Sequence, residues 1–335
     1  MKAIVYDRPG LPIDSPHALF EIDLPKPQPG QNDLLVKIQA VSVNPVDTKL
    51  RLGMPTNAPR ILGWDAVGTV EAVGAEVSLF KAGDEVWYAG DITRPGSYAE
   101  YGLVDERIAA RRPTSISAVE SAALPLTSIT AWELLFDRLG IDEGAGEGQR
   151  LLVIGAGGGV GSVLVQLART LTKLTIIGTA SRPETKAWVG ELGAHFVVDH
   201  SQPLQPQLSA LGVDGVEHVV SLTHTETYFE QLVGLLKPEG NLALIDDPAT
   251  LDIMPFKRKS ISVHLEFMFT RAMYRTATMI KQHHLLERIS ALIDAGVLKT
   301  TVGEHFGTIN AQNLRRAHAL IESHKAKGKI VLAGF

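Results

Sequence analysis

The chain has 335 residues, of which 45% are hydrophobic and 21% are charged, and its formal net charge is −5 at pH 7. These values are typical of a globular protein with two domains, and because no block rich in lysine and arginine stands out we expect no nucleic-acid partner. The absence of cysteine excludes disulfides, iron–sulfur clusters and thiolate zinc sites, and because neither a membrane-spanning apolar run nor a signal-peptide pattern is present we expect a cytoplasmic protein without a membrane partner.

Residues 1–125 contain the short β-branched and aromatic runs of a β-rich domain. The expected strands cover residues 3–6, 34–40, 68–73 and 84–88. Proline, glycine, asparagine and aspartate separate these runs. The proline-dense segment 25–30 is expected to be an irregular connector, because proline fits neither a central strand nor a helix interior.

Beyond residue 125 the pattern changes to alternating helices and strands. A helical pattern over 127–139 comes first. Six apolar strands are then expected at 151–154, 174–179, 195–198, 216–222, 242–245 and 261–265. The accompanying helices are expected near 160–172, 184–192, 226–236 and 275–295. This alternation predicts a parallel sheet covered on both faces, and six strands fit the doubly wound α/β fold.

The C-terminal segment returns to a different pattern. Asn310 is expected to cap a helix, and residues 329–332 are expected to form a short strand. We expect this segment to complete the N-terminal domain. The predicted boundaries are therefore 1–125 together with 297–335 for one domain, and 126–296 for a dinucleotide-binding domain.

A glycine-rich run over residues 155–161 follows the first of the six strands and precedes a helix. Glycines mark any tight turn, but strand, glycine turn and helix together are how a protein presents helix N–H groups to a pyrophosphate. Ala156-x-Gly158-x-x-Gly161 matches the dinucleotide fingerprint with alanine in the first position. No Gly-Lys-Ser/Thr sequence follows, which disfavours a nucleoside triphosphate loop. We expect the pyrophosphate at the helix that begins near Val160.

The end of the second strand indicates which dinucleotide is bound. NAD enzymes place an acidic residue there, whereas this chain has Ser181 and Arg182, which suit a 2′-phosphate. Lys186 and His200 are expected to add charge or stacking, so NADPH is the expected cofactor. The alternative is that Arg182 is only a surface residue. The residues that end the fourth strand are expected beside the nicotinamide, because ligands bind outside the carboxyl ends of parallel strands. The predicted cofactor-binding residues are Gly155, Ala156, Gly158, Gly159, Val160, Gly161, Ser181, Arg182, Lys186, His200, Leu222 and Thr223.

Six motifs occur in an order that resembles a known superfamily. They are the segments 41–47 (VSVNPVD), 63–68 (GWDAVG), 83–86 (GDEV), 96–101 (GSYAEY), 130–132 (TAW) and 155–161 (GAGGGVG). Together they resemble the medium-chain dehydrogenase/reductase superfamily over essentially the whole chain, and within it the zinc-free quinone oxidoreductase-like branch. The resemblance implies a GroES-like catalytic domain beside a Rossmann domain, a cofactor in the cleft between them, and a homodimer. It also places Asn44 and Asp47 near the cleft and Thr130 at the nicotinamide end, although Thr130 could also be only a helix-start residue.

The resemblance carries a conflict over metal. Segment 266–271 is similar to proteins often labelled zinc-type alcohol dehydrogenase-like. Zinc-dependent relatives have cysteine near the position of Asn44 and histidine in a Gly-His-Glu motif, where this chain has tryptophan at Trp64 and no cysteine anywhere. Asp65 falls where relatives often carry a carboxylate, and it could serve a structural hydrogen bond. We therefore expect no metal.

Without a metal to polarise a carbonyl, hydride transfer from a nicotinamide favours an acceptor in which conjugation spreads the negative charge that develops. We therefore expect an NADPH-dependent reductase of a quinone or an α,β-unsaturated carbonyl, with Thr130, Asn44 and Asp47 as the candidate catalytic residues. The chain has no Tyr-x-x-x-Lys sequence, the pair with which short-chain dehydrogenases polarise a carbonyl. Two alternatives stay open: an alcohol dehydrogenase or carbonyl reductase of the same superfamily, and a cofactor-binding structural protein with little turnover.

Overall fold

The computed structural model describes residues 1–335 and divides them into two compact units. The first unit comprises Met1–Ile129 and Phe269–Phe335, and the second comprises Thr130–Met268. Residues 269–296, which the sequence analysis grouped with 126–296, thus lie in the first unit, where helix α9 (Lys281–Asp294) contacts strand β8 (Ala109–Arg111).

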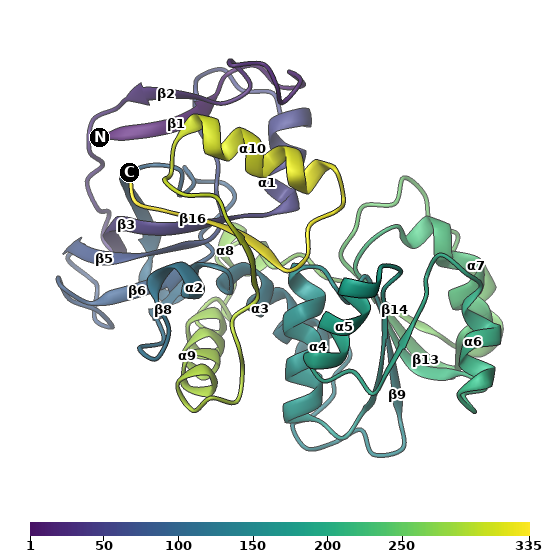
Figure 1. The fold of residues 1–335 in the computed structure, drawn as a ribbon. Helices are drawn as coiled ribbons and strands as arrows, with labels where there is room; N and C mark the ends of the chain where they lie inside the picture. The colour runs from purple at the N-terminus through teal and green to yellow at the C-terminus, as the bar shows by residue number, and fades with distance from the viewer. The chain divides into compact units, whose positions relative to one another are not determined.

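A six-stranded parallel sheet forms the centre of the second unit (Figure 1). Its order β11-β10-β9-β12-β13-β14 is the 3-2-1-4-5-6 order of the doubly wound dinucleotide fold, which confirms the expected α/β class. The strands are β9 (Arg150–Ile154), β10 (Thr175–Thr179), β11 (Phe196–Val198), β12 (Val216–Ser221), β13 (Leu236–Leu244) and β14 (Ser262–Leu265). All six expected strands are present, and β13 begins six residues earlier than the predicted 242–245.

Helices cover this sheet because its strands are apolar on both faces. Leu152 and Ile154 of β9 belong to a core that includes Leu204, Leu208 and Leu232, while the alternate β9 residues are also fully buried. The helices of the unit are α4 (Gly159–Leu171), α5 (Pro183–Glu191), α6 (Leu204–Ala210) and α7 (Thr225–Leu235), with a 3-10 turn η3 (Met254–Lys259). Helix α6 was not predicted, because prolines at 203 and 206 obscure its pattern, although proline is tolerated in the first turn of a helix.

Two antiparallel-rich sheets build the first unit. One has the order β2-β1-β4, and the other has the order β15-β16-β3-β5-β6-β8, with β7 also paired to β3. The strands are β1 (Lys2–Tyr6), β2 (Phe20–Asp23), β3 (Asp33–Val43), β4 (Arg60–Ile61), β5 (Ala66–Val73), β6 (Glu85–Tyr88), β7 (Tyr101–Asp105), β8 (Ala109–Arg111), β15 (Val302–His305) and β16 (Lys329–Ala333). Strand β16 pairs antiparallel with β3, so the C-terminal segment completes this sheet as expected.

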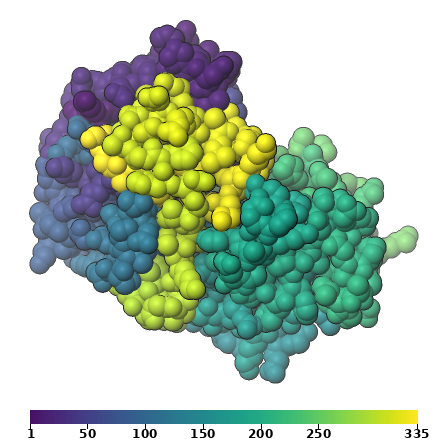
Figure 2. Space-filling model, viewed as in Figure 1, coloured from purple at the N-terminus to yellow at the C-terminus, as the bar shows by residue number.

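The helices of the first unit range from single turns to the 14 residues of α9. They are α1 (Pro45–Gly53), the 3-10 turn η1 (Glu106–Ile108), α2 (Ala118–Ala122), α8 (Thr270–Met273), α9 and α10 (Ala311–Glu322). Asn310 caps α10 as predicted, because its side chain accepts a hydrogen bond from the N–H of Asn313 at 2.8 Å. Figure 2 shows the yellow C-terminal residues lying against the purple N-terminal ones on one face of this unit.

Two expected helices differ from the prediction. The helix expected over 127–139 is α3 (Pro125–Trp132) followed by a π-helical segment, η2 (Glu133–Arg138). The helix expected over 275–295 begins six residues later, at Lys281 of α9, because the backbone between α8 and α9 includes Arg275 at the left-handed φ of +45°. None of the helices has the length and apolar character needed to cross a bilayer.

One buried histidine gives the first unit a pH-dependent stability. His318 of α10 is fully buried against the ring of Tyr98, 6.1 Å away between centroids, and neither ring nitrogen has a hydrogen-bond partner. Burial lowers the pKa of His318 to about 3. Below pH 6.5 the unfolded chain therefore binds a proton that the folded chain does not, and the free energy of unfolding falls as the pH falls.

We predict that His318→Leu removes this loss. In urea titrations at pH 7.5 and pH 5, the stability of the variant relative to the native protein rises by about 2 kcal/mol at the lower pH, because the native protein alone loses the contribution of His318. The exposed His17, changed to leucine, is the control and shows no such difference. A difference for His318→Leu that does not depend on pH would contradict the assignment.

Candidate functional site

The glycine turn of the second unit joins β9 to α4 with the geometry of a dinucleotide site. Gly155 has a φ of +81°, so it provides the tight turn one residue before Ala156. A Cβ on Gly161 would lie 2.6 Å from the backbone of Ala156 and Gly155, so only glycine lets α4 begin this close to the turn. Sequence reasoning identified these positions, but the residue that makes the turn is Gly155.

The N-terminus of α4 presents backbone donors. Its N-cap is Gly158, which has no side chain to cap the helix. The first intrahelical hydrogen bond runs from the N–H of Ser162 to the carbonyl of Gly158 at 2.9 Å. The N–H groups of Gly159, Val160 and Gly161 lie before this bond and have no intrahelical acceptor. Uncapped N–H groups and the positive end of the helix dipole together attract an anion such as a pyrophosphate.

The end of β10 lies beside this turn. Thr179 is fully buried, and its hydroxyl accepts a hydrogen bond from the N–H of Gly155 at 3.1 Å. The same hydroxyl lies 3.2 Å from Nδ1 of His200, whose pKa is lowered by burial. The structure therefore connects His200 to the glycine turn through Thr179, a residue that sequence analysis missed because threonine is ordinary in a strand.

Two cations follow β10, and each is close to an acidic residue. Arg182 is the N-cap of α5, and its Nε lies 3.4 Å from Glu184 in a half-exposed pair. Lys186 binds Asp199 at 2.8 Å, and this hydrogen bond, with those from Ser201, holds the pKa of Asp199 well below its usual range. Because an exposed ion pair contributes little free energy, Arg182 can leave Glu184 and bind another anion at little cost.

The remaining predicted residues of the second unit lie at or near the same edge. The N–H of Leu222 bonds the carbonyl of Ile154 at 3.2 Å, and a Cβ on Gly155 would meet the Thr223 methyl group at 3.1 Å. Ser181 is half-buried between Ala180 and Arg182.

Thr130 is buried in the second half of α3, so it is not a helix-start residue.

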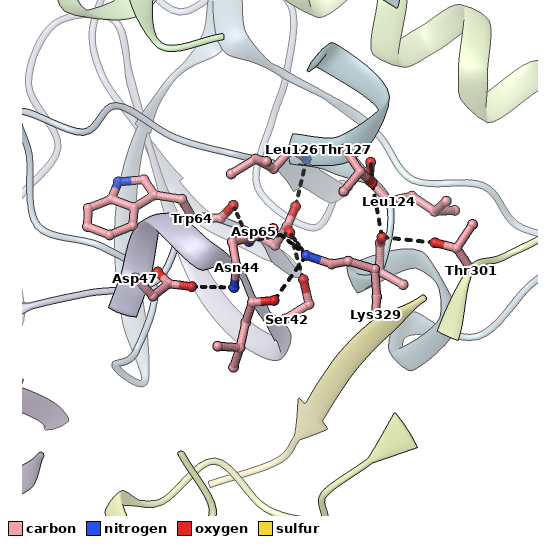
Figure 3. Close-up of polar contacts among 12 residues, drawn as sticks. Ser42, Asn44, Asp47, Trp64, Asp65, Leu124, Leu126, Thr127, Thr301 and Lys329 are labelled. Atoms are coloured by element: carbon pink, nitrogen blue, oxygen red, sulfur yellow. Dashed lines mark hydrogen bonds and ion pairs between the residues drawn. The ribbon is translucent and has the colours of Figure 1, made fainter. Parts of the chain in front are cut away.

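A buried polar cluster in the first unit surrounds Asp65 (Figure 3). This carboxylate is fully buried, and it accepts hydrogen bonds from Ser42 Oγ at 2.6 Å and Asn44 Nδ2 at 2.8 Å. Its other oxygen accepts from the N–H of Leu126 at 2.7 Å, which fixes the first turn of α3. Asp65 thus connects the end of β3, the 63–65 loop and the start of α3.

Lys329 brings a cation into this cluster from β16 (Figure 3). Its Nζ lies 3.1 Å from Asp65 Oδ2 and 3.2 Å from the carbonyl of Val43, and it also donates to Asn44 Oδ1. The three N–H groups of the ammonium thus have three acceptors inside the protein, so the charge is buried but fully paired.

Asn44 and Asp47 are both buried and hydrogen-bonded to the chain itself. The Asn44 amide donates to Asp65 and to the carbonyl of Trp64, and its oxygen accepts from Lys329. Asp47 accepts from the N–H of Asn44 at 2.6 Å and from that of Gly63 at 3.1 Å. Burial raises the pKa of Asp47 to about 7, against the opposing effect of the Asn44 hydrogen bond. These contacts hold the 63–65 loop against the start of α1, and a catalytic role for either residue stays a prediction.

The donor set here does not fit a catalytic zinc ion. The oxygens of Asn44 and Asp65 are occupied by the ammonium of Lys329, and the indole of Trp64 has no lone pair to offer a metal. No group of three or more histidine, cysteine, aspartate or glutamate side chains is arranged to hold an ion. The residues of this cluster therefore do not fit a zinc ion.

Comparisons with known proteins define the class. Residues 30–114 match the alcohol dehydrogenase GroES-like domain, and residues 192–332 match the zinc-binding dehydrogenase family. A zinc-type alcohol dehydrogenase-like protein of Staphylococcus aureus strain MSSA476 is 41% identical over 99% of both chains. A chloroplastic quinone oxidoreductase of Triphysaria versicolor is 30% identical over 99% of this chain and 98% of its own.

Solved structures agree with this class. A crystal structure from Rhizobium etli CFN 42, whose name is that of a zinc-dependent alcohol dehydrogenase, is 51% identical with a TM-score of 0.97, covering 100% of this chain and 98% of that one. The mycobacterial protein Rv1454c, complexed with NADPH, is 28% identical with a TM-score of 0.85 over 99% of both chains. The fold is thus that of a two-domain dehydrogenase. The chain belongs to the medium-chain dehydrogenase/reductase superfamily of oxidoreductases.

We predict that Lys329→Met lowers the free energy of unfolding by about 3–5 kcal/mol, because it leaves the Asp65 carboxylate buried without its cation. The measurement is urea unfolding near neutral pH, with the exposed Lys37 of β3 changed to methionine as the matched control. Adding Asp65→Asn to Lys329→Met recovers part of the loss, because the uncompensated charge is then removed. A Lys329→Met protein as stable as the Lys37→Met protein would show that the pair is not needed.

Proposed function

We propose that the protein is an NADPH-dependent reductase that transfers hydride to a quinone or an α,β-unsaturated carbonyl without a metal. The observation that carries this proposal is the Lys329 ammonium paired with Asp65 and Asn44, in a chain whose second unit has the glycine turn of a dinucleotide site. The quinone oxidoreductase of Triphysaria supports the substrate class. The NADPH complex of the mycobacterial relative supports the cofactor.

The residues of the second unit fit a phosphorylated dinucleotide. We propose that the pyrophosphate binds the N–H groups of Gly159–Gly161. The space beside them is open, because a Cβ on Gly158 would approach only the carbonyl of Gly155, at 3.5 Å. The 2′-phosphate is assigned to Ser181, Arg182 and Lys186, because the end of β10 carries no acidic residue to repel it. Lys186 remains paired with Asp199, so Arg182 supplies the charge that decides between NADPH and NADH.

A bound nicotinamide supplies a hydride to an electrophilic carbon. In a conjugated acceptor the negative charge that develops is spread over several atoms, so hydrogen-bond donors can stabilise it without a Lewis acid. We assign the proton relay to the buried hydroxyl of Thr130. Asn44 and Asp47 hold the backbone of the 63–65 loop and the start of α1. We assign to both residues the role of positioning these segments as part of the wall of the substrate site.

A homodimer forms part of the proposal. Strand β14 is the edge of the parallel sheet, and Leu265 and Phe267 at its end are 71% and 47% exposed. An exposed strand edge with apolar side chains favours pairing with a second copy across a two-fold axis.

The test is an acceptor panel. Consumption of NADPH is followed with p-benzoquinone, cyclohexenone and benzaldehyde, and we expect kcat/KM for the quinone or the enone to exceed that for the aldehyde by about tenfold or more. A preference for benzaldehyde would instead support an alcohol dehydrogenase or carbonyl reductase, the function suggested by the name of the Staphylococcus relative. Tight NADPH binding without any oxidation would indicate a structural protein.

The cofactor is tested in the same assay with Arg182→Ala. We expect KM for NADPH to rise by about tenfold or more while KM for NADH is unchanged, because only NADPH carries the phosphate that Arg182 binds. Arg258→Ala, which removes an exposed arginine of the same unit, is the control. Equal changes for both cofactors would reject the assignment of NADPH specificity.

A further inference from the structure

A cavity of about 380 Å³ opens on the first unit, outside the polar cluster of Asp65. Its wall includes the turn at residues 30–32 and the side chains of Asp33, Asp105, Arg94, Arg107 and Arg275. A volume of this size is within the range of small-molecule sites. We propose that this cavity binds a small organic polyanion through its carboxylate or phosphoryl oxygens.

The first guanidinium is held rigidly. Arg94 forms two parallel hydrogen bonds to the Asp33 carboxylate, both at 2.8 Å, and the N–H of Gly30 binds the same carboxylate at 3.0 Å. Asp33 is nearly buried and Arg94 is mostly so. Because both oxygens of Asp33 hold this guanidinium, it cannot rotate freely. The three N–H groups that the pair does not use, Nε–H among them, therefore have set directions.

The second guanidinium is fixed in the same manner. Arg107 donates from Nε to Asp105 Oδ1 at 2.8 Å and from a terminal nitrogen to Oδ2 at 2.6 Å. The Asp105 carboxylate also accepts the backbone N–H of Arg107 at 3.0 Å. One terminal nitrogen of Arg107 remains for a ligand, and both fixed arginines border the same cavity.

The third guanidinium is the one that gives the cavity its net charge. The Arg275 side chain makes no hydrogen bond or ion pair within the protein. Its backbone N–H donates to the carbonyl of Ala272 at 3.1 Å, and its φ of +45° lies in the left-handed region, which is unusual for a residue other than glycine. Burial acts to raise the pKa of Asp33, yet that pKa is lowered because Arg94 binds the carboxylate and the charge of Arg275 faces it. Three arginines against two aspartates leave one positive charge in the cavity.

This arrangement selects the class of ligand. Guanidinium groups match the planar or tetrahedral oxyanions of carboxylates and phosphates, and several such groups in one cavity favour a ligand with more than one anionic centre. The site is separate from the polar cluster, because Asp33 begins β3 and Asn44 follows the last residue of that strand. The proposal therefore does not depend on the proposed function.

The experiment is isothermal titration calorimetry of the full chain with citrate and with inorganic phosphate, at constant ionic strength. We expect saturable binding of citrate, which has the charge and size for the cavity, and weaker binding of phosphate. Arg275→Gln is expected to weaken citrate binding by about tenfold or more, because it removes the guanidinium that makes no side-chain hydrogen bond to the protein and supplies the excess positive charge. The exposed Arg8, changed to glutamine, removes the same charge elsewhere in the unit and leaves binding unchanged.

The outcomes separate the sources of the anion. Tighter binding of phosphate than of citrate would assign the site to phosphoryl groups, whereas tighter binding of citrate assigns it to carboxylates. The absence of saturable heat with both probes overturns the proposal, as does an equal effect of Arg8→Gln and Arg275→Gln, which would show only long-range attraction. Circular dichroism of both variants confirms that they remain folded.

Discussion

The buried ion pair between Lys329 and Asp65 is the constraint on which the first unit depends. Removing both charges from water is unfavourable, so each charge needs hydrogen-bond partners inside the protein. The carboxylate accepts hydrogen bonds from Ser42, Asn44 and the N–H of Leu126, and the ammonium donates to the carbonyl of Val43 and to Asn44. These contacts join the end of β3, the 63–65 loop, the start of α3 and the C-terminal strand. The chain must therefore return from residue 269 onward to complete a site that begins near residue 42.

The same pair supports the proposal that this member of the superfamily works without zinc. A metal needs acceptor atoms that are free to bind it, and here those atoms already surround a protein cation. In the proposed reaction, hydrogen-bond donors stabilise the developing negative charge, and this suits acceptors that spread the charge by conjugation. The second unit follows a similar principle, because uncapped N–H groups of α4 provide positive character without any ion.

Local patterns in the sequence were sufficient for the parallel sheet and for the glycine turn. Strand, turn and helix follow one another without interruption from Arg150 to Leu171 there, so apolar periodicity and glycine spacing are informative. The ion pair could not be predicted, because Lys329 lies 264 residues from Asp65 and its strand looks like any short terminal strand. Arg275 also escaped prediction, since no glycine or proline marks the break between α8 and α9. Thr179 and Asp199 also escaped prediction, because the hydrogen bonds that they accept from Gly155 and Lys186 join elements that are separate in the sequence.

We propose that the Lys329–Asp65 pair leaves this protein without a catalytic metal ion. Zinc content measured by inductively coupled plasma mass spectrometry, after incubation of the purified protein with excess zinc and removal of loosely bound ions, tests it most directly. The account predicts far less than one zinc ion per chain and unchanged activity after treatment with a chelator. One zinc ion per chain, with activity lost to the chelator, would contradict it.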